Sequence, residues 1–378
     1  MRRGTALICA VAAAALLPAF AGAQAPDAQP FVAKLASEGE RNRVLNDMEI
    51  GARSFWYGDL DGARQALDET LTGINTVYAN DPAAEKARSL WYAEGSKNFK
   101  GEPYERAMAF FYRGLVFLAE GDYQNARAAA RQGLLQDAFA EDDQSRADFA
   151  LLMFLDAWAS HLDKNKDLED QAMTELKKFR PTFPGIKPED DTLILVETGT
   201  APRKVADGMN HSYYVVRRGR GFTENRVQMV MNGAATPLFP MEDIYYQAAT
   251  RGGRPVDQIL KGKAQFRSNT AGAGNFLLGS AVAFQDSGAN LGPATYVVGG
   301  IGAMSAFLSS RANAEADTRS WSALPDTIHV MTMSSKDIPA DGVVFQFLAN
   351  DAPVAGMDKT VKMKTDPEGG HFIFARSR

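Results

Sequence analysis

Histidines, cysteines and paired carboxylates carry much of enzyme chemistry, and this chain of 378 residues offers few of them in useful arrangements. Its four histidines are well separated along the sequence: His161, His211, His329 and His371. The chain has no HExxH or paired-histidine zinc spacing, no GxSxG, no Walker loop and no dinucleotide fingerprint. The sequence therefore predicts no catalytic residue, no metal site, no cofactor site and a protein that is not an enzyme.

Two carboxylates, Glu197 and Asp317, support an alternative in which the protein acts on cell-wall or surface polysaccharide. Glycoside cleavage needs two carboxyl groups a few ångströms apart. The alternative therefore requires these two side chains to meet in a polar cleft.

The first residues have the layout of a secretory signal peptide. Two arginines precede an uncharged stretch whose apolar part, residues 6–17, is shorter than a membrane span. Small residues end this stretch, which favours cleavage after Ala23 and predicts residues 1–23 as the signal. We expect a periplasmic mature chain that begins at Gln24, and an uncleaved anchor helix is the alternative.

The single cysteine, Cys9, lies inside the apolar run rather than directly after it. This position is wrong for a lipoprotein signal, and cleavage would leave a mature chain without disulfides or a thiolate nucleophile. Loss of the two signal arginines would change the formal net charge from −5 to −7. A mildly acidic chain argues against nucleic acid as a partner.

Residues 24–185 are expected to form an all-helical domain. From residue 31 to residue 178, apolar residues recur at three- and four-residue spacing, which predicts six or seven amphipathic helices. Two segments share a template of small residues, a Gly-Asp turn and a following alanine. The first contains Gly51, Gly58 and Ala63; the second contains Gly114, Phe117, Gly121, Tyr123 and Ala126.

This template resembles the tetratricopeptide repeat. Gly114 and Ala126 would let two antiparallel helices approach, Phe117 and Tyr123 would fill the wedge, and Gly121 would form the turn. The first copy has Ser54 in place of the aromatic residue, and a third candidate, residues 149–184, lacks the glycine turn. We expect a short tetratricopeptide-like solenoid; an ordinary helical bundle is the alternative.

Prolines and a glycine break the helical pattern near residue 185, and residues 186–378 are expected to form an α+β domain. Strand-like runs occur at 192–198, 212–217 and 226–231, and a helix pair is predicted within 241–263. Four further runs, 327–333, 343–348, 360–363 and 371–375, predict a C-terminal antiparallel sheet or half-sandwich. The overall fold class is α+β.

Residues 268–310 are rich in glycine and carry a single charge, at Asp286. Buried helices that pack closely on the sheet explain this composition, and so does packing in an oligomer or a peripheral membrane contact. Frequent Ser, Asn and Thr make insertion across a membrane unfavourable. The segment is predicted to be a helical insert.

Three phrases resemble a family of proteobacterial envelope proteins, many of them lipoprotein-like, that joins an N-terminal tetratricopeptide-like domain to a C-terminal α+β domain. They are GEPYERAMAFFYRGLVFLAEGDY at 101–123, ETGTAPRK at 197–204 and ADTRSWSALPDTIHV at 316–330. The resemblance implies a role in envelope assembly and supplies no catalytic residue. We expect Trp321 and Pro325 to fix the entry into the closing sheet, and Arg203 and Arg319 to pair with acidic neighbours.

These observations predict a non-enzymatic periplasmic scaffold that binds other envelope proteins through its helical groove. The residues chosen for the binding face are Tyr92, Tyr104, Arg113 and Arg127. A membrane-associated oligomeric envelope component is a further alternative, through the glycine-rich insert.

Overall fold

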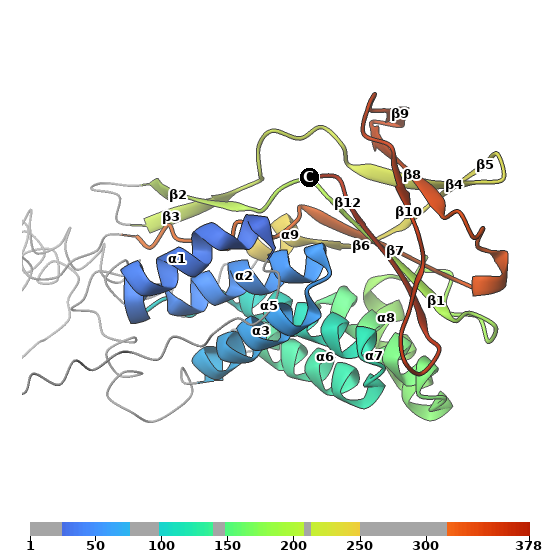
Figure 1. Ribbon diagram of the computed structural model, residues 1–378, viewed down its shortest axis with the longest axis horizontal. Coiled ribbons are helices and arrows are strands. Elements are labelled where there is room, and N and C mark those ends of the chain that lie inside the picture. Colours follow the sequence, from blue (N-terminus) through green and yellow to red (C-terminus); the bar gives the residue numbers. More distant parts are fainter. Residues whose placement is uncertain (1–24, 76–97, 139–147, 208–212, 250–315) are drawn as a thin grey trace, which may run out of the picture.

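The computed structural model describes residues 25–75, 98–138, 148–207, 213–249 and 316–378 (Figure 1). The predicted signal peptide, Tyr92, His211 and the glycine-rich insert lie outside the described residues. The described helices and strands form an α+β fold, as expected.

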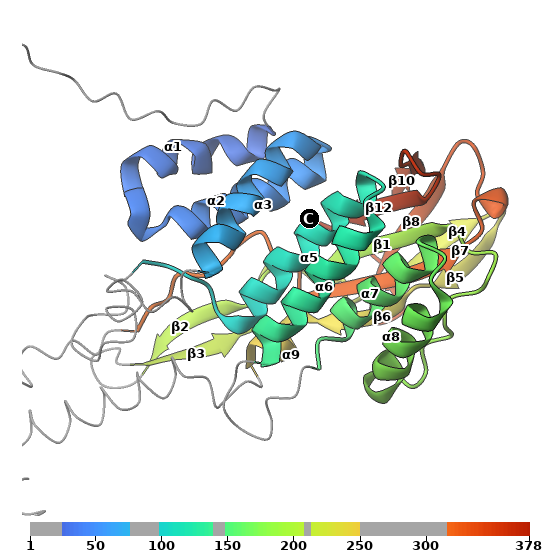
Figure 2. The ribbon, with the colours of Figure 1, turned by 90° about the horizontal axis from the view of Figure 1, so that it is seen from below.

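Within the described residues, seven α-helices precede the first strand; residues 76–97 and 139–147 of the predicted helical region lie outside them. The seven helices are α1 (Gln29–Glu38), α2 (Arg43–Tyr57), α3 (Leu60–Asn75), α5 (Pro103–Ala119), α6 (Tyr123–Ala138), α7 (Ala150–Leu162) and α8 (Lys166–Phe179). The helices form three hairpins, α2–α3, α5–α6 and α7–α8. Consecutive hairpins pack side by side, through α3 with α5 and through α6 with α7 (Figure 2). A short α9 (Ile244–Ala249) follows later in the chain.

The two predicted Gly-Asp turns have the same backbone hydrogen bonds. Asp59 donates its N–H to the carbonyl of Ser54 and Gly58 to that of Phe55, and the second turn repeats both bonds 63 residues later. This pair of bonds is the Schellman ending of a helix, and it requires a left-handed residue. Gly58 has φ +88° and Gly121 has φ +74°. In each turn the Asp side chain then caps the next helix.

The turn between α7 and α8 has the same pair of bonds without glycine. Asn165 donates to the carbonyl of Ser160 and Lys164 to that of His161, with Lys164 in the left-handed region at φ 57°. Asn165 caps α8 by accepting from the N–H of Leu168. The third candidate repeat therefore makes the same turn, although the sequence template finds no glycine there.

Two larger sheets and one hairpin follow the helices. The central sheet has the order β11 (Lys364–Thr365), β12 (His371–Arg376), β1 (Thr192–Thr198), β7 (Thr327–Met333) and β6 (Phe239–Asp243). The outer sheet has the order β10 (Lys359–Val361), β8 (Val343–Ala349), β4 (Arg226–Met231) and β5 (Ala234–Pro237), with β9 (Ala352–Pro353) beside β8. The hairpin is β2 (Arg203–Asp207) with β3 (Tyr213–Arg217).

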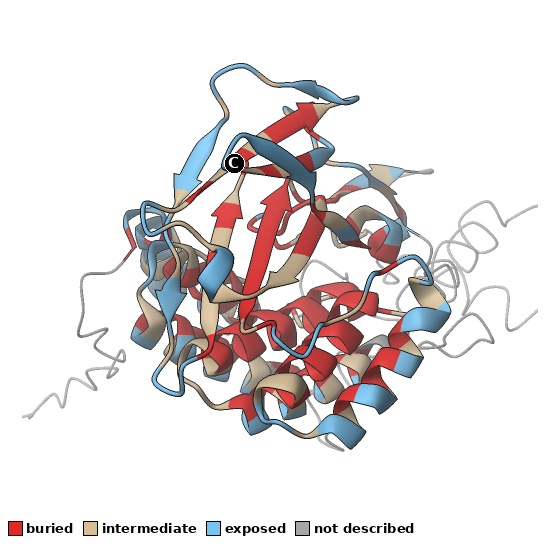
Figure 3. Cartoon of the chain, turned by 90° about the vertical axis from the view of Figure 1, so that its right-hand side faces the viewer, coloured by how far each residue is buried: buried red, intermediate tan, exposed pale blue. Residues whose placement is uncertain are grey.

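The fold has three layers: helices, central sheet and outer sheet (Figure 3). Alternate side chains of β1 point to opposite faces of the central sheet. Leu193 and Leu195 join the cluster against the helices, whereas Ile194 and Val196 join the cluster between the sheets. All seven residues of β1 are buried for this reason.

The predicted C-terminal antiparallel sheet does not form as one sheet. The closing strands divide between the two sheets, and β12 pairs with β1 in parallel. The reason is that β1 is apolar on both faces and needs strands on both edges and a layer on each side. In the described part of the predicted helix pair at 241–263, the chain leaves β6, an edge strand that tolerates Pro240, and forms α9; residues 250–263 lie outside the described residues.

The change from helix to strand falls between α8 and β1, close to the expected boundary at residue 185. The largest hydrophobic cluster nevertheless contains residues from both sides of it. Trp321, expected to fix the entry into the closing sheet, is 1% exposed in this cluster, and its backbone N–H donates to Glu105 of α5. Helices and sheet therefore share one core.

Candidate functional site

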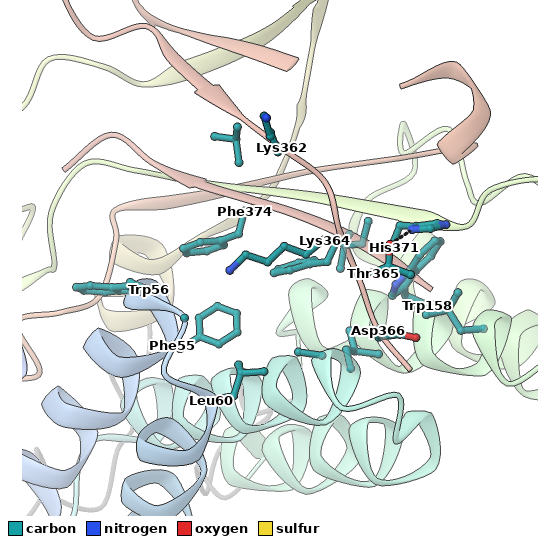
Figure 4. Close-up of a pocket in the computed structure, with 17 residues that line it drawn as sticks. Phe55, Trp56, Leu60, Trp158, Lys362, Lys364, Thr365, Asp366, His371 and Phe374 are labelled. Atoms are coloured by element: carbon teal, nitrogen blue, oxygen red, sulfur yellow. Dashed lines mark hydrogen bonds between the residues drawn. The ribbon is translucent and has the colours of Figure 1, made fainter. Parts of the chain in front are cut away.

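A cavity of about 190 Å³ lies between the ends of the helices and the β11–β12 hairpin (Figure 4). We call it the aromatic chamber. Its apolar lining comes mainly from Phe55, Trp56, Leu60, Leu118, Trp158, Leu162, Leu193, Phe372 and Phe374. Its polar lining consists of Lys362, Lys364, Thr365, Asp366 and His371 on the C-terminal strands. The chamber thus has an aromatic and aliphatic lining to which the C-terminal strands add charged and polar side chains.

The first Gly-Asp turn positions one wall of the chamber. Phe55 and Trp56 are the last full turn of α2, and Leu60 begins α3 directly after the turn. The ring of Phe55 meets the ring of Phe374 edge to face, with 5.3 Å between centroids. The alternation of β12 places Phe372 and Phe374 on the same side of the strand, toward the helices.

A buried network of a cation–π contact, an ion pair and a hydrogen bond holds Trp56 in place. The Arg376 guanidinium carbon lies 3.0 Å from the centroid of the Trp56 ring, and Arg376 Nε donates to Glu197 at 2.8 Å. Tyr112 of α5 donates its hydroxyl to the other carboxylate oxygen of Glu197 at 2.6 Å. Burial raises the pKa of Glu197, and Arg376 opposes this rise.

On the opposite side, Trp158 of α7 is fixed by His161. The two rings stack with 5.4 Å between centroids. The imidazole lies 3.1 Å from a carboxylate oxygen of Glu169 and 2.8 Å from the carbonyl oxygen of Asp190. Hydrogen bonds at both ring nitrogens leave His161 one orientation, so the Trp158 wall is preorganised.

Lys364 extends across the chamber, with its ammonium group between the rings of Phe55 and Phe374 in the view of Figure 4. The ammonium nitrogen would lie 3.3 Å from a Cβ placed on Gly58. It therefore sits at the C-terminal end of α2, where the helix dipole favours a cation. Among the described residues, Lys364 has no ion pair, and neither does Lys362.

The second Gly-Asp turn is hydrogen-bonded to the tip of the same β11–β12 hairpin, and Tyr123 there borders a separate, more open and more polar cavity of about 490 Å³. Tyr123 donates its hydroxyl to the Asp366 carboxylate, 2.9 Å from Oδ2. Burial and this carboxylate raise the pKa of Tyr123, which keeps the hydroxyl protonated as the donor. The same Asp366 accepts from the backbone N–H of Glu368 and of Gly370, which fixes the tip of the hairpin.

The expected repeat-packing residues lie at helix contacts. A Cβ on Gly51 would come within 2.7 Å of Leu67 of α3, and one on Gly114 within 2.6 Å of Leu155 of α7. Ala63 and Ala126 are fully buried. Phe117 is partly buried and lies under the Arg113 guanidinium, 3.6 Å from its carbon.

Three of the residues chosen for partner binding are used inside the fold. Tyr104 is 2% exposed and Arg113 is 5% exposed, with Arg113 bonded to Asp68 at 2.7 Å. Arg127 is more accessible and lies 3.3 Å from the buried carboxylate of Asp156. Neither Tyr104 nor Arg113 presents a side chain to a docked partner, because helix α5 is apolar around nearly its whole circumference and is buried on all sides.

The carboxylates of the polysaccharide alternative also have structural partners. Glu197 is 1% exposed and belongs to the Trp56 support described above, and Asp317 pairs with Arg319 at 2.7 Å, as expected for that arginine. Arg203 instead donates to the carbonyl of Arg218. His329 is fully buried, which lowers its pKa to about 3.

The described residues contain neither a metal-binding cluster nor a membrane-spanning helix. No cluster of three or more His, Cys, Asp or Glu side chains suitable for a metal ion occurs there. None of the helices in that part of the chain combines the length and apolar character needed to cross a membrane. In comparisons with known proteins, no family model, curated protein or solved structure matched the chain.

The sequence reasoning missed the chamber because its walls are far apart in the chain. The available signals were the adjacent Phe55 and Trp56 before the first turn and the alternating Phe372 and Phe374 near the C-terminus. Taken alone, each of these two aromatic pairs is typical of an ordinary hydrophobic core. Their meeting depends on the pairing of β12 with β1, which is a long-range event.

Proposed function

We propose that this protein is a non-enzymatic periplasmic adaptor that binds envelope proteins, and that the aromatic chamber takes one large apolar side chain of the partner. The observation that carries the proposal is a preorganised, aromatic-lined chamber beside a row of lysines without carboxylate partners. Buried pockets that take a single anchor residue dominate the energy of many protein interfaces.

The size of the chamber suits one anchor. Apolar cavities of roughly 150 Å³ bind benzene, and the chamber is about 190 Å³. A phenyl ring or a branched aliphatic side chain therefore fits, whereas a long acyl chain does not. Burying such a group would contribute about 1.5–3 kcal/mol.

The helical hairpins support an adaptor role. Three hairpins with one turn geometry stack in sequence order, which is the construction of tetratricopeptide-like scaffolds. In this proposal the binding face is the turn edge of the hairpins, where Gly58 and Gly121 meet the β11–β12 hairpin, rather than the face around Tyr104 and Arg113.

Site-specific photocrosslinking in the cells that make the protein tests the proposal. A photoreactive residue at Lys362, on the rim of the chamber, should give discrete protein adducts in the envelope. The same residue at Lys336, an exposed lysine away from the chamber, is the matched control.

Leu60→Trp supplies the second comparison, because its larger ring fills the chamber. Adducts at position 362 should disappear in this variant and persist in Leu135→Trp, which enlarges an exposed leucine on α6. Adducts that persist in Leu60→Trp, or an equal yield at positions 362 and 336, would contradict the proposal.

A further inference from the structure

A second cavity, of about 350 Å³, adjoins the aromatic chamber on the other side of Trp56. We call it the basic vestibule. Trp56, Val361 and Phe374 line both cavities, so a ligand that occupies one lies next to the other. Its charged lining consists of Arg53, Lys359, Arg376 and Arg378, with Asp27 opposing them.

Each of the three arginines of the vestibule is held in place by an ion pair with a buried glutamate. Arg53 lies 3.1 Å from Glu49, Arg376 2.8 Å from Glu197, and Arg378 3.0 Å from Glu224. The glutamate side chains are at most 2% exposed. Such pairs hold the guanidinium groups in place while leaving further N–H donors for a ligand.

Lys359 is the cation of the vestibule that lacks a carboxylate of its own. Its ammonium group donates to the carbonyl oxygen of Arg376, and within the described residues it has no ion pair. Burial lowers the pKa of Lys359, the charges of Arg376 and Arg378 lower it further, and the Glu224 carboxylate opposes this lowering. An anion placed here would relieve the repulsion among these cations.

The positive charge continues along the same strand segment into the chamber. Lys359 lies in β10, Lys362 in the connection that follows and Lys364 in β11, and none pairs with a carboxylate among the residues that the structure describes. Opposite charges thus favour a ligand whose acidic group lies close to its apolar group.

We infer that the partner segment carries a carboxylate directly beside its apolar anchor, and that the basic vestibule binds this carboxylate while the chamber binds the anchor. The inference rests on the proposed function and defines the chemistry of the partner. The carboxylate is either the α-carboxylate of a C-terminal aromatic residue or an Asp or Glu side chain next to an internal one. A peptide is favoured over a lipid because the chamber holds a single side chain and not an acyl chain.

Fluorescence anisotropy with labelled peptides tests the inference on the full mature chain. The probes are Gly-Ser-Gly-Ser-Phe with a free C-terminus, the same peptide as its C-terminal amide, an internal Glu-Phe peptide, and Gly-Ser-Gly-Ser-Ala. At low salt, the free acid or the Glu-Phe peptide should bind roughly tenfold more tightly than the amide. Whichever of the two binds identifies the source of the carboxylate.

Lys359→Gln should abolish the preference for the carboxylate and leave the binding of the amide unchanged. Lys336→Gln, which makes the same change of charge at an exposed site, should keep the preference. Leu60→Trp should weaken every phenylalanine peptide, and circular dichroism establishes that each variant is folded.

The possible failures are distinct. Equal affinity for the acid, the Glu-Phe peptide and the amide, with loss in Leu60→Trp, would overturn the inference and leave the proposed function standing. Binding of no peptide, together with no chamber-dependent crosslink, would overturn both. Dodecanoate that displaces the peptides at lower concentration than the free peptide would overturn the assignment to a peptide.

Discussion

The two Gly-Asp turns of the helical layer share a backbone but differ in how they meet the C-terminal hairpin. Their residues correspond at an offset of 63, and their hydrogen bonds correspond one by one. The residue after the Gly-Asp pair is Leu60 in the first turn and Tyr123 in the second. Tyr123 ties the hairpin to α6 through Asp366, whereas Leu60 makes no such bond and lines the aromatic chamber.

The difference shows how a repeated structural unit acquires a site. The part that both turns share, a left-handed glycine and an Asp cap, gives the turn its shape. The variable residue that follows either bonds the turn to the strand hairpin, as Tyr123 does, or lines the aromatic chamber, as Leu60 does. We call the end of the β11–β12 hairpin that Tyr123 bonds beside Gly121 the sealed end, and the part that lines the aromatic chamber beside Gly58 the open end; in our proposal the partner binds at the open end.

The third helical hairpin, α7–α8, is attached to the central sheet in a different way from the two Gly-Asp turns, through a buried carboxylate. Glu242 of β6 accepts from the backbone N–H of Leu151 at the start of α7 and pairs with Arg180. Burial raises the pKa of Glu242 to about 7, and Arg180 opposes this rise. The folded protein thus keeps a proton on Glu242 at pH values where the unfolded chain has lost it.

The largest expected effect follows from this carboxylate. Because the folded pKa is above the unfolded value of 4.5, its contribution to stability is fully present below pH 4.5 and is lost as the pH rises toward 7. We expect the unfolding free energy of the wild type to fall relative to Glu242→Gln by up to about 1.4 kcal/mol per pH unit in this window. Urea unfolding at several pH values measures it, and parallel pH profiles for the two proteins would refute the assignment.

Substitution of the turn glycines should separate the sealed end from the open end. Gly58→Ala should lower the unfolding free energy by about 1–2 kcal/mol, the cost of a left-handed non-glycine residue. Gly121→Ala should cost roughly 1 kcal/mol more, because its Cβ would also lie 2.8 Å from Glu368. Urea unfolding gives both values, and a larger loss for Gly58→Ala would contradict the comparison.

Tyr123→Phe tests the bond that seals the second turn. The variant keeps the ring and removes the donor to Asp366, so we expect a loss of about 1–2 kcal/mol in the unfolding free energy. Hydrogen exchange should become faster at the N–H groups of Glu368 and Gly370, which share the carboxylate. Unchanged exchange at both positions would show that Tyr123 does not hold the hairpin tip.

The smallest expected effect concerns the third turn. Lys164 takes the left-handed conformation that glycine takes in the other two, so Lys164→Gly should relieve strain. The gain is partly offset by the greater freedom of glycine in the unfolded chain, which leaves a stabilisation of up to about 1 kcal/mol. A thermal melt measures the sign, and a destabilised variant would mean that Lys164 contributes contacts that outweigh its strain.

Local features were predictable from the sequence, and long-range pairings were not. Gly58 and Gly121 could be identified as turns because glycine and aspartate specify that geometry, and β1, β4 and β7 begin and end where the residue pattern predicts. Lys164 was missed because a lysine gives no local sign of a left-handed backbone.

The chamber and the vestibule depend on contacts between distant segments. The pairing of β12 with β1 brings Phe374 to Phe55 and Arg376 to Glu197, and nothing in either local sequence specifies the other. The predicted binding residues Tyr104 and Arg113 lie on α5, which is buried in the fold, and Arg113 is bonded to Asp68 of α3. Sequence periodicity could not show this burial, because it depends on packing against segments that are distant in the sequence, such as α3.

The central claim, that an apolar anchor enters the chamber left open at the first turn, is tested most directly by NMR of the protein with labelled leucine methyl groups. With the free-acid Gly-Ser-Gly-Ser-Phe and Glu-Phe peptides, the claim predicts intermolecular NOEs from the phenylalanine ring to the methyl groups of Leu60 and Leu118, and none to those of exposed Leu135. A bound peptide whose ring contacts neither Leu60 nor Leu118 would contradict the claim.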